Sequence, residues 1–287
     1  MLGMLIILPP SETKATGGSG ASLNVEELFL AGPLTGSMTS ATADVTAVRA
    51  RLVTGLAQSA AKTPKQAQKL IGLKDSQVSE LEHNAHVLDS STMPAIERYT
   101  GVAYGALDVT GESTGVPLDS AARQRLAIGS ALFGVVGAED QIPYYRLSAG
   151  SKVKVRGIGQ PVTVRSQWAK VLTPALQEWQ AAQPAADNAI IDLRSGGYLN
   201  LGPVPGALKL RVESLYPDGS RKVVSHFNKH FKGLVSRELA LAGVSIPAEN
   251  AAAAFCDVVA GVPSFIDANF STEILDAENV TLIVPAE

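Results

Sequence analysis

The sequence predicts an α/β protein in which helices surround one mixed sheet, in a single domain over residues 1–287. Short apolar runs typical of strands alternate along the chain with segments of helical periodicity. No shift in composition divides the chain, and it holds no internal repeat. Of its 287 residues, 46% are hydrophobic, which is enough apolar material for a sizeable core.

The first predicted strand covers residues 4–8, five apolar residues typical of a strand buried on both faces. A double proline then ends the strand, because a proline ring has no N–H to donate to a sheet ladder. Ser11, Thr13 and Lys14 follow. Ligands of open α/β sheets bind at the carboxyl ends of strands, so these two hydroxyls and one ammonium group predict an anion site. A plain polar loop is the alternative.

Residues 63–88 predict two short helices that resemble a helix-hairpin-helix. Pro64 suits the first turn of the first helix, and Gly72 ends that helix. The second helix is expected from Asp75 or Ser76 to about residue 87. In a helix-hairpin-helix, the backbone amides of the hairpin bind DNA phosphates, although ordinary helical pairs share the pattern. The candidate contacts are Lys65, Gly72 and Lys74.

The remaining elements follow from periodicity and punctuation. Helices are expected over residues 23–31, 39–61, 119–128 and 166–183, and strands over residues 188–193, 207–213, 221–227 and 279–285. We expect the helix at 166–183 to restart at Pro174. The strand at 188–193 leads into Arg194, Ser195 and Tyr198, which again places polar groups at the carboxyl end of a strand.

The net charge of −3 conceals segregated charges. Residues 141–177 and 221–237 contain no acidic residue, and no Lys or Arg follows Arg237. The basic residues of the two windows are Arg146, Lys152, Lys154, Arg156, Arg165, Lys170, Arg221, Lys222, Lys229, Lys232 and Arg237. This distribution favours one basic face and one acidic face over an evenly mixed surface.

The second basic window lies partly on a helix that begins near Lys229, with Asn228 as its expected N-cap. At about 100° per residue, one arc of this helix is apolar. The opposite arc holds Lys229, His230, Lys232, Gly233, Ser236 and Arg237. We expect Lys229 and Lys232 to face solvent, and Gly233 to let a phosphate or a partner backbone come close. An ordinary solvated face is the alternative.

Three segments together resemble the peroxide stress protein YaaA family. They are residues 4–14, residues 129–147 with their Pro-Tyr-Tyr-Arg-Leu motif, and residues 225–237. The segments occur in order over nearly the whole chain. The chain departs from the family at His230, where the pattern has a second lysine.

The resemblance implies a cytoplasmic protein that limits damage from peroxide and free iron and binds double-stranded DNA in a positively charged cleft. The phosphate-binding candidates are Lys14, Arg146, Lys229, Lys232 and Arg237. Residues expected to support the cleft are Ser11, Thr13, Tyr144, Arg194, Ser195, Tyr198, His230 and Ser236.

An enzyme is the alternative function, with Ser11, Lys14, Arg194, Ser195 and Tyr198 lining a pocket for a small phosphorylated or nucleotide ligand. We favour the binding protein, and expect no catalytic residue, no cofactor, no membrane association and no obligate protein partner. The histidine pairs 83/86 and 226/230 lack the carboxylate or cysteine that would complete a known metal-ligand spacing, so no metal is expected. The single cysteine, Cys256, fits a reducing compartment.

Overall fold

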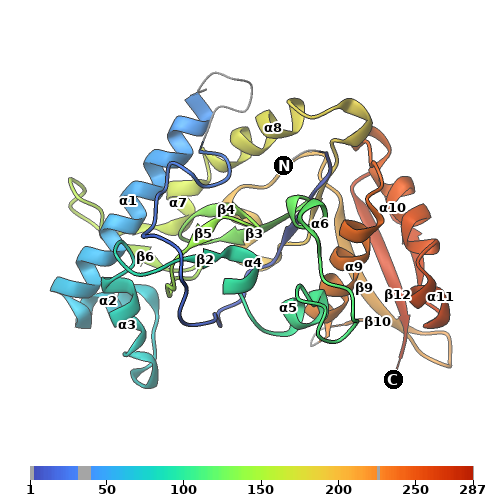
Figure 1. Cartoon of the computed structure of the whole chain (residues 1–287), viewed down its shortest axis with the longest axis horizontal. Helices are drawn as coiled ribbons and strands as arrows, with labels where there is room; N and C mark the ends of the chain where they lie inside the picture. The colour runs from blue at the N-terminus through green and yellow to red at the C-terminus, as the bar shows by residue number, and fades with distance from the viewer. Residues whose placement is uncertain (1–2, 32–39, 225–226, 287) are drawn as a thin grey trace.

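The structure, a computed structural model, describes residues 3–31, 40–224 and 227–286, and its centre is two mixed four-stranded sheets (Figure 1). In the first sheet the strand order is β4 (Gly134–Gly137), β3 (Leu126–Ser130), β1 (Leu5–Leu8) and β8 (Ile190–Asp192). Strand β1 is parallel to both β3 and β8, whereas β4 is antiparallel to β3. The first strand of the chain is therefore an interior strand of its sheet.

The second sheet has the order β10 (Arg221–Val223), β9 (Lys209–Leu215), β12 (Asn279–Pro285) and β11 (Ser271–Ile274). Ile191 of β8 forms a parallel bridge with Leu208, and Asp192 N–H donates to the Leu208 carbonyl at 2.8 Å. The bridge joins the two sheets at the start of β9. Two small pairs complete the strands: β2 (Met93–Pro94) with β5 (Gln141–Ile142), and β6 (Lys152–Val153) with β7 (Val162–Thr163).

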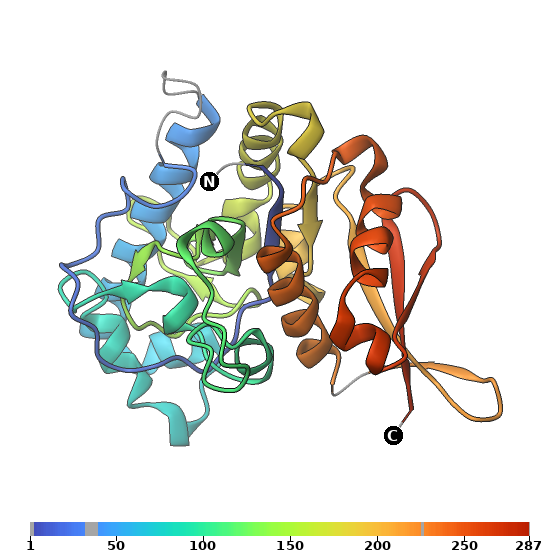
Figure 2. The same cartoon turned by 45° about the vertical axis from the view of Figure 1, so that its right-hand side comes forward.

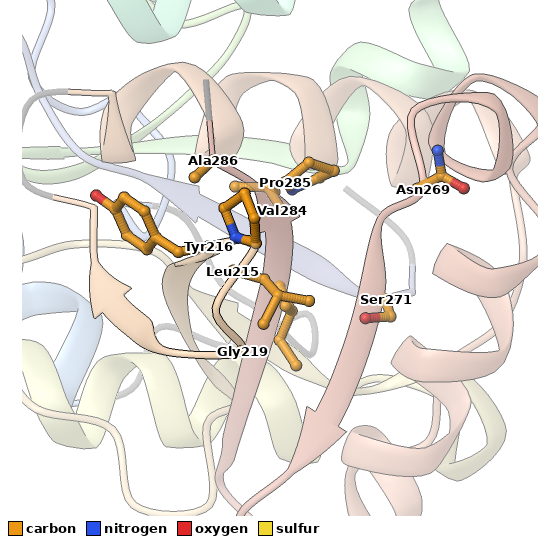
Figure 3. Close-up of a pocket in the computed structure, with 10 residues that line it drawn as sticks. Leu215, Tyr216, Gly219, Asn269, Ser271, Val284, Pro285 and Ala286 are labelled. Carbon is orange, nitrogen blue, oxygen red and sulfur yellow. The ribbon is translucent and has the colours of Figure 1, made fainter.

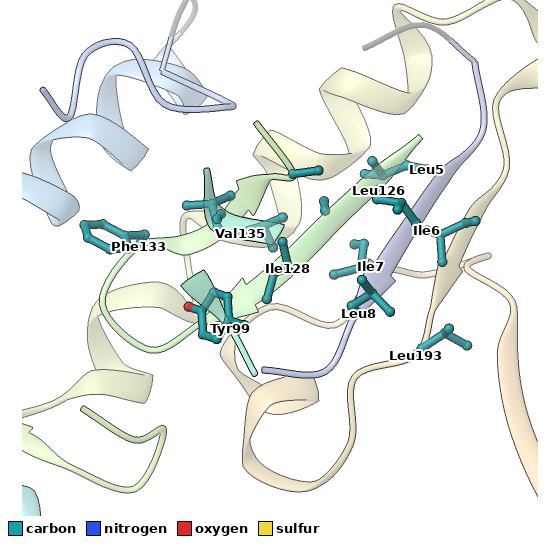
Figure 4. Packing of buried hydrophobic residues seen from close by; sticks show 14 of the residues in the cluster. Leu5, Ile6, Ile7, Leu8, Tyr99, Leu126, Ile128, Phe133, Val135 and Leu193 are labelled. Atoms are coloured by element: carbon teal, nitrogen blue, oxygen red, sulfur yellow. The ribbon is translucent and has the colours of Figure 1, made fainter. Parts of the chain in front are cut away.

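The core is built around β1, whose four residues are all fully buried (Figure 4). Ile6 is paired with Leu126 on one side and Ile191 on the other. A strand covered on both faces and both edges needs apolar residues at every position, and the run at 5–8 meets that need. Each buried leucine or isoleucine contributes about 1.5–3 kcal/mol.

Helices cover both sheets. They are α1 (Ser40–Lys62), α2 (Pro64–Ile71), α3 (Glu80–Ala85), α4 (Ala95–Arg98), α5 (Val102–Leu107), α6 (Ser120–Gln124), α7 (Val164–Trp168), α8 (Leu172–Ala181), α9 (Asn228–Ala242), α10 (Ala251–Ala260) and α11 (Pro263–Asp267). Figures 1 and 2 show α1–α3 at one side of the molecule and α9–α11 with the second sheet at the other. Helix α9 packs between α5 and α10.

The α/β class with mixed sheets and surrounding helices is confirmed, but the single sheet divides into two, and several boundaries differ. Residues 23–31 form turns instead of a helix. The helix expected over 119–128 ends at Gln124, because the next residues pair with β1 as β3. The helix expected over 166–183 is two helices, and Pro174 lies in the first turn of the second.

The helix-hairpin-helix is not confirmed. Helix α2 ends at Gly72, whose φ of 72° is left-handed, as expected for a glycine cap. The single second helix is replaced by a 3₁₀ turn (Asp75–Gln77) and the short α3. Within the described ranges, no helix is both long and apolar enough to span a bilayer.

Candidate functional site

Three parallel strands bring their carboxyl ends to one edge of the first sheet. The segment after β1 carries Lys14, β3 ends at Ser130, and the segment after β8 begins with Arg194. Figure 4 shows the Tyr99 ring near Ile128, beside the end of β3. The strand-end location predicted from the sequence is therefore the location of a polar cluster.

Lys14 is the central residue of this cluster. Its backbone forms an isolated antiparallel bridge with Tyr99. The residue lies in the interior, with only 9% of its surface exposed. The Nζ atom lies 4.4 Å from the centroid of the Tyr145 ring and 5.1 Å from that of the Tyr99 ring. Both distances suit a contact between an amine and aromatic faces.

The polar contacts of Lys14 are weak. Its Nζ donates to the carbonyls of Ser11 at 3.3 Å and Glu12 at 3.5 Å, and no carboxylate of the described chain lies within ion-pair distance of it. Arg146 donates to the same Glu12 carbonyl at 2.9 Å and pairs with the Glu12 carboxylate at 2.6 Å. Burial, and then the charge of Arg146, lower the pKa of Lys14 to about 7, against the opposing charges of Glu80 and Glu12.

A chain of hydroxyls lies under the amine. The Tyr99 and Tyr145 hydroxyls are 2.6 Å apart, and Tyr145 is 2.7 Å from the Ser130 hydroxyl. Tyr104 donates to the Pro9 carbonyl at 3.0 Å and stacks on Tyr99. Burial raises the pKa of Tyr99 to about 12, so these phenols remain protonated. Tyr99, Tyr104 and Tyr145 were not among the residues predicted for the site, although the doubled tyrosine of the Pro-Tyr-Tyr-Arg motif is a signal for Tyr145.

Tyr144 and Glu80 border the same site. The Tyr144 ring packs on His83 with centroids 4.2 Å apart. Burial, followed by a hydrogen bond to Glu80 and its charge, raises the pKa of Tyr144 to about 12. The Oε2 atom of Glu80 is buried and has no hydrogen-bond partner in the part of the chain that the structure describes. Glu80, like the three tyrosines, was not among the residues predicted for the site.

The other strand-end residues divide between the interior and the surface. Arg194 is buried against Asp192, with Nε–Oδ1 and Nη2–Oδ2 distances of 2.8 and 2.6 Å. Ser11 and Thr13 lie beside Lys14 with their hydroxyls 3.0 Å apart. Ser195 is exposed. Tyr198 is half-buried, and burial raises its pKa, with a further contribution from Tyr99.

The polar arc of α9 is turned inward, so the expectation that Lys232 faces solvent is wrong. Lys232 is 6% exposed, and its Nζ donates to the Leu193 carbonyl at 2.9 Å. Burial lowers its pKa, although the charge of Asp192 opposes this. Gly233 lies against Ala103 of α5, where a side chain would clash. Gly233 thus serves the approach of a partner backbone, which was one of its two expected roles.

Arg237 and Ser236 are also interior residues. Arg237 is 2% exposed and donates to the carbonyls of Leu107, Asp108 and Val116 and to the Thr114 hydroxyl. Ser236 donates to the Lys232 carbonyl at 2.7 Å. Of the expected cations of this helix, only Lys229 is exposed, and His230 is half-buried. His226, the other member of the 226/230 histidine pair that was judged not to form a metal site, lies outside the described residues.

Two pockets, one distant from the site and one next to it, are lined by different kinds of side chain. One of about 480 Å³ lies at the far end of the second sheet (Figure 3), with no charged side chain in its lining, which includes Leu215, Tyr216 and Ser271. Another of about 450 Å³ adjoins the tyrosine cluster on the α5 side. Its lining includes Glu97, Asp108 and Glu112, which suit a phosphate poorly. No group of three metal-binding side chains occurs among the residues the structure describes.

Comparison with known proteins identifies relatives of this chain. The family model for the peroxide stress protein YaaA matches residues 4–255. A UPF0246 protein of Corynebacterium efficiens is 41% identical over 98% of this chain and 100% of its own length. UPF0246 proteins of Corynebacterium glutamicum and Streptomyces coelicolor are 44% and 34% identical, over 83% and 84% of this chain and 85% of each relative. The chain therefore belongs to the peroxide stress protein YaaA family.

Proposed function

We propose that this protein acts in the cytoplasm during peroxide stress, binds double-stranded DNA and limits the damage that free iron causes. Membership of the family supports the stress role. The observation that supports DNA binding is an exposed basic surface formed by the end of α1, by α2 and the turn after it, and by the segment that follows β6, away from the inward-facing cations of α9. Its members are Lys62, Lys65, Lys69, Lys74, Lys154 and Arg156.

Packing holds the parts of this basic surface together. The Ser151 hydroxyl donates to the Ile71 carbonyl at the end of α2 at 3.4 Å. The Lys154 backbone lies directly against Gly55 of α1, where a Cβ would clash with it. As a result, Lys62, Lys154 and Arg156 line one shallow pocket of about 260 Å³.

The charges of the basic surface are available to a ligand. None of its six cations forms an ion pair with a carboxylate in the described ranges, whereas Arg146 is paired with Glu12. Exposed, unpaired cations gain most from phosphates, because each contact releases a condensed counterion from the duplex. Contacts of this kind position a protein on DNA without reading its sequence, so we expect little sequence preference.

Fluorescence anisotropy with a labelled duplex tests the proposal. Replacing Lys154 and Arg156 by glutamate should lower the affinity about ten-fold or more at about 100 mM salt, and reduce the slope of log K against log salt by about 2. The control is the Lys170→Glu, Lys222→Glu variant, which makes the same charge change at two exposed lysines outside the basic surface. Wild-type affinity in the Lys154, Arg156 variant, or an equal loss in the control, would contradict binding at the basic surface.

A further inference from the structure

DNA binding at the basic surface leaves the amine of Lys14 unexplained. With 9% of its surface exposed, Lys14 cannot lie along a phosphate backbone as an exposed lysine does. Its only hydrogen bonds in the described chain are the two long ones to Ser11 and Glu12 carbonyls. A buried lysine that served only the fold would gain from a carboxylate partner, and Lys14 has none.

The groups around Lys14 lower the pKa of its amine, so that a large part of it is neutral near physiological pH. Arg146 lies beside it, since both donate to the Glu12 carbonyl, and Arg98 adds a second positive charge. The carboxylates of Glu80 and Glu12 act in the opposite sense and are outweighed, mainly by burial. With a pKa of about 7, roughly half of the amine carries a free lone pair near pH 7.

We propose that Lys14 is a nucleophile that condenses with an aldehyde to form an imine. The Nζ lone pair attacks the carbonyl carbon, and a proton moves from nitrogen to the carbonyl oxygen. The hydroxyl so formed then leaves as water together with the second proton of the nitrogen, which leaves a C=N bond with no change of oxidation state. A desolvated lysine with a lowered pKa suits this chemistry.

Neighbouring side chains suit the proton movements. Glu80 carries a buried carboxylate oxygen that no donor satisfies among the described residues, and its charge reaches Lys14. It is a candidate to accept the proton of the ammonium form. The hydroxyls of Ser11 and Thr13 lie on the same segment and can stabilise the oxygen of the intermediate.

The aldehyde could come from two sources. The ring-opened sugar of an abasic site in bound DNA carries one, and so does a free phosphorylated aldehyde. Only the first source rests on the proposed DNA binding. Both present the same carbonyl carbon to Lys14, so one trapping experiment on the full chain tests the chemistry and separates the sources.

The experiment reduces any imine irreversibly with cyanoborohydride and locates the modified lysine by peptide mass spectrometry. One arm uses a duplex with a single abasic site, with the intact duplex as its control, and the other uses glycolaldehyde phosphate. The matched reference is Lys222, which also lies over a ring, with its Nζ 4.7 Å from the Tyr216 centroid, but is exposed. At pH 7 we expect Lys14 to be modified at least about ten-fold faster than Lys222 in one arm or both.

The pH dependence and two variants complete the test. The rate at Lys14 should level off above about pH 7. Lys14→Arg and Lys14→Met should give no adduct at position 14. Modification of Lys14 no faster than Lys222 in both arms would overturn the proposal, and this comparison within the wild-type chain does not depend on how the variants fold. Modification by the small aldehyde alone would support the chemistry even if anisotropy showed no DNA binding.

Discussion

Lys14 and Arg237 are both cations with less than a tenth of their surface exposed, yet the protein holds them in different ways. Arg237 donates to four oxygens of the segment 107–116, and two of these bonds measure 2.6 and 2.7 Å. Lys14 makes two bonds longer than 3.2 Å and rests on aromatic faces. The contrast shows that burial alone does not identify a structural cation; the quality of its hydrogen bonds does.

The chemistry of the two side chains explains the difference. A guanidinium remains charged at any ordinary pH, so a buried arginine needs acceptors for its donors. An amine can instead lose its proton when it is buried, and then needs fewer partners. Arg237 therefore fastens α9 to the segment that follows α5, while Lys14 remains available for other chemistry.

The largest expected effect is on the arginine side of this comparison. Arg237→Met should lower the free energy of unfolding by about 3–5 kcal/mol, because three carbonyls and one hydroxyl lose a buried charged donor. Urea denaturation measures the change. Lys229→Met on the same helix is exposed and should shift stability by less than about 0.5 kcal/mol. Equal effects of the two substitutions on the free energy of unfolding would contradict the structural role of Arg237.

Lys14→Met should raise the free energy of unfolding, whereas Arg237→Met should lower it. Burial lowers the pKa of Lys14 from 10.5 to about 7 in the folded chain. Between these pH values the unfolded chain binds a proton that the folded chain does not, so wild-type stability rises with pH across this window and falls as the pH drops toward 7. We expect the variant to be more stable by about 1–4 kcal/mol at pH 6, with the gain vanishing near pH 10.5. Denaturation series at several pH values check this, and a variant less stable than wild type at pH 6 would contradict it.

Gly233→Ala probes how α9 is seated, with a smaller effect. A Cβ there meets the Ala103 backbone carbonyl and the Ala106 side chain. The helices must separate slightly, which should cost about 1–3 kcal/mol and weaken the contacts of Arg237. Thermal unfolding of Gly233→Ala beside Gly105→Ala is a suitable comparison, since Gly105 has open space at its Cβ position. Unchanged stability in Gly233→Ala would mean that the α5–α9 contact is loose.

The smallest effect concerns the surface ion pair at the site. Glu12 is 70% exposed, so Glu12→Gln should change stability by less than about 1 kcal/mol despite losing its 2.6 Å contact with Arg146. The substitution removes a charge that raises the pKa of Lys14. The midpoint of the pH dependence of Lys14 trapping should therefore move down, and a midpoint that moves up would contradict the charge balance described above.

The parts of the fold that were predictable have strong local signals. The run at 4–8 is apolar throughout and the segment at 279–285 is mostly apolar, and both are observed as strands, Leu5–Leu8 and Asn279–Pro285. The prediction of a helix over 119–128 is wrong for its last residues. Residues 126–130 instead form a strand that pairs with β1, which lies more than a hundred residues away in sequence. Tertiary pairing of this kind overrides local propensity.

The location of the candidate site was predictable, but the burial and the contacts of its side chains were not. A strand end with Lys14 is visible in the sequence, but its two rings come from Tyr99 and Tyr145, outside that segment. The prediction for the polar arc of α9 is wrong for a related reason. Lys232 was expected to face solvent and Arg237 to bind phosphate from the same arc, whereas backbone carbonyls of other segments satisfy both side chains. A one-dimensional pattern carries no information about such acceptors.

The interior position of β1 has a consequence for the order of folding. Both neighbours of this strand are remote in sequence, since Ile6 pairs with residues 126 and 191. During synthesis, β1 emerges before both of its partners: β3 follows only when somewhat less than half of the chain has been made, and β8 only at some two-thirds. Such long-range closure slows folding. We therefore expect the Lys14 site to be among the last parts to acquire native structure, and refolding to be slow for a chain of this size.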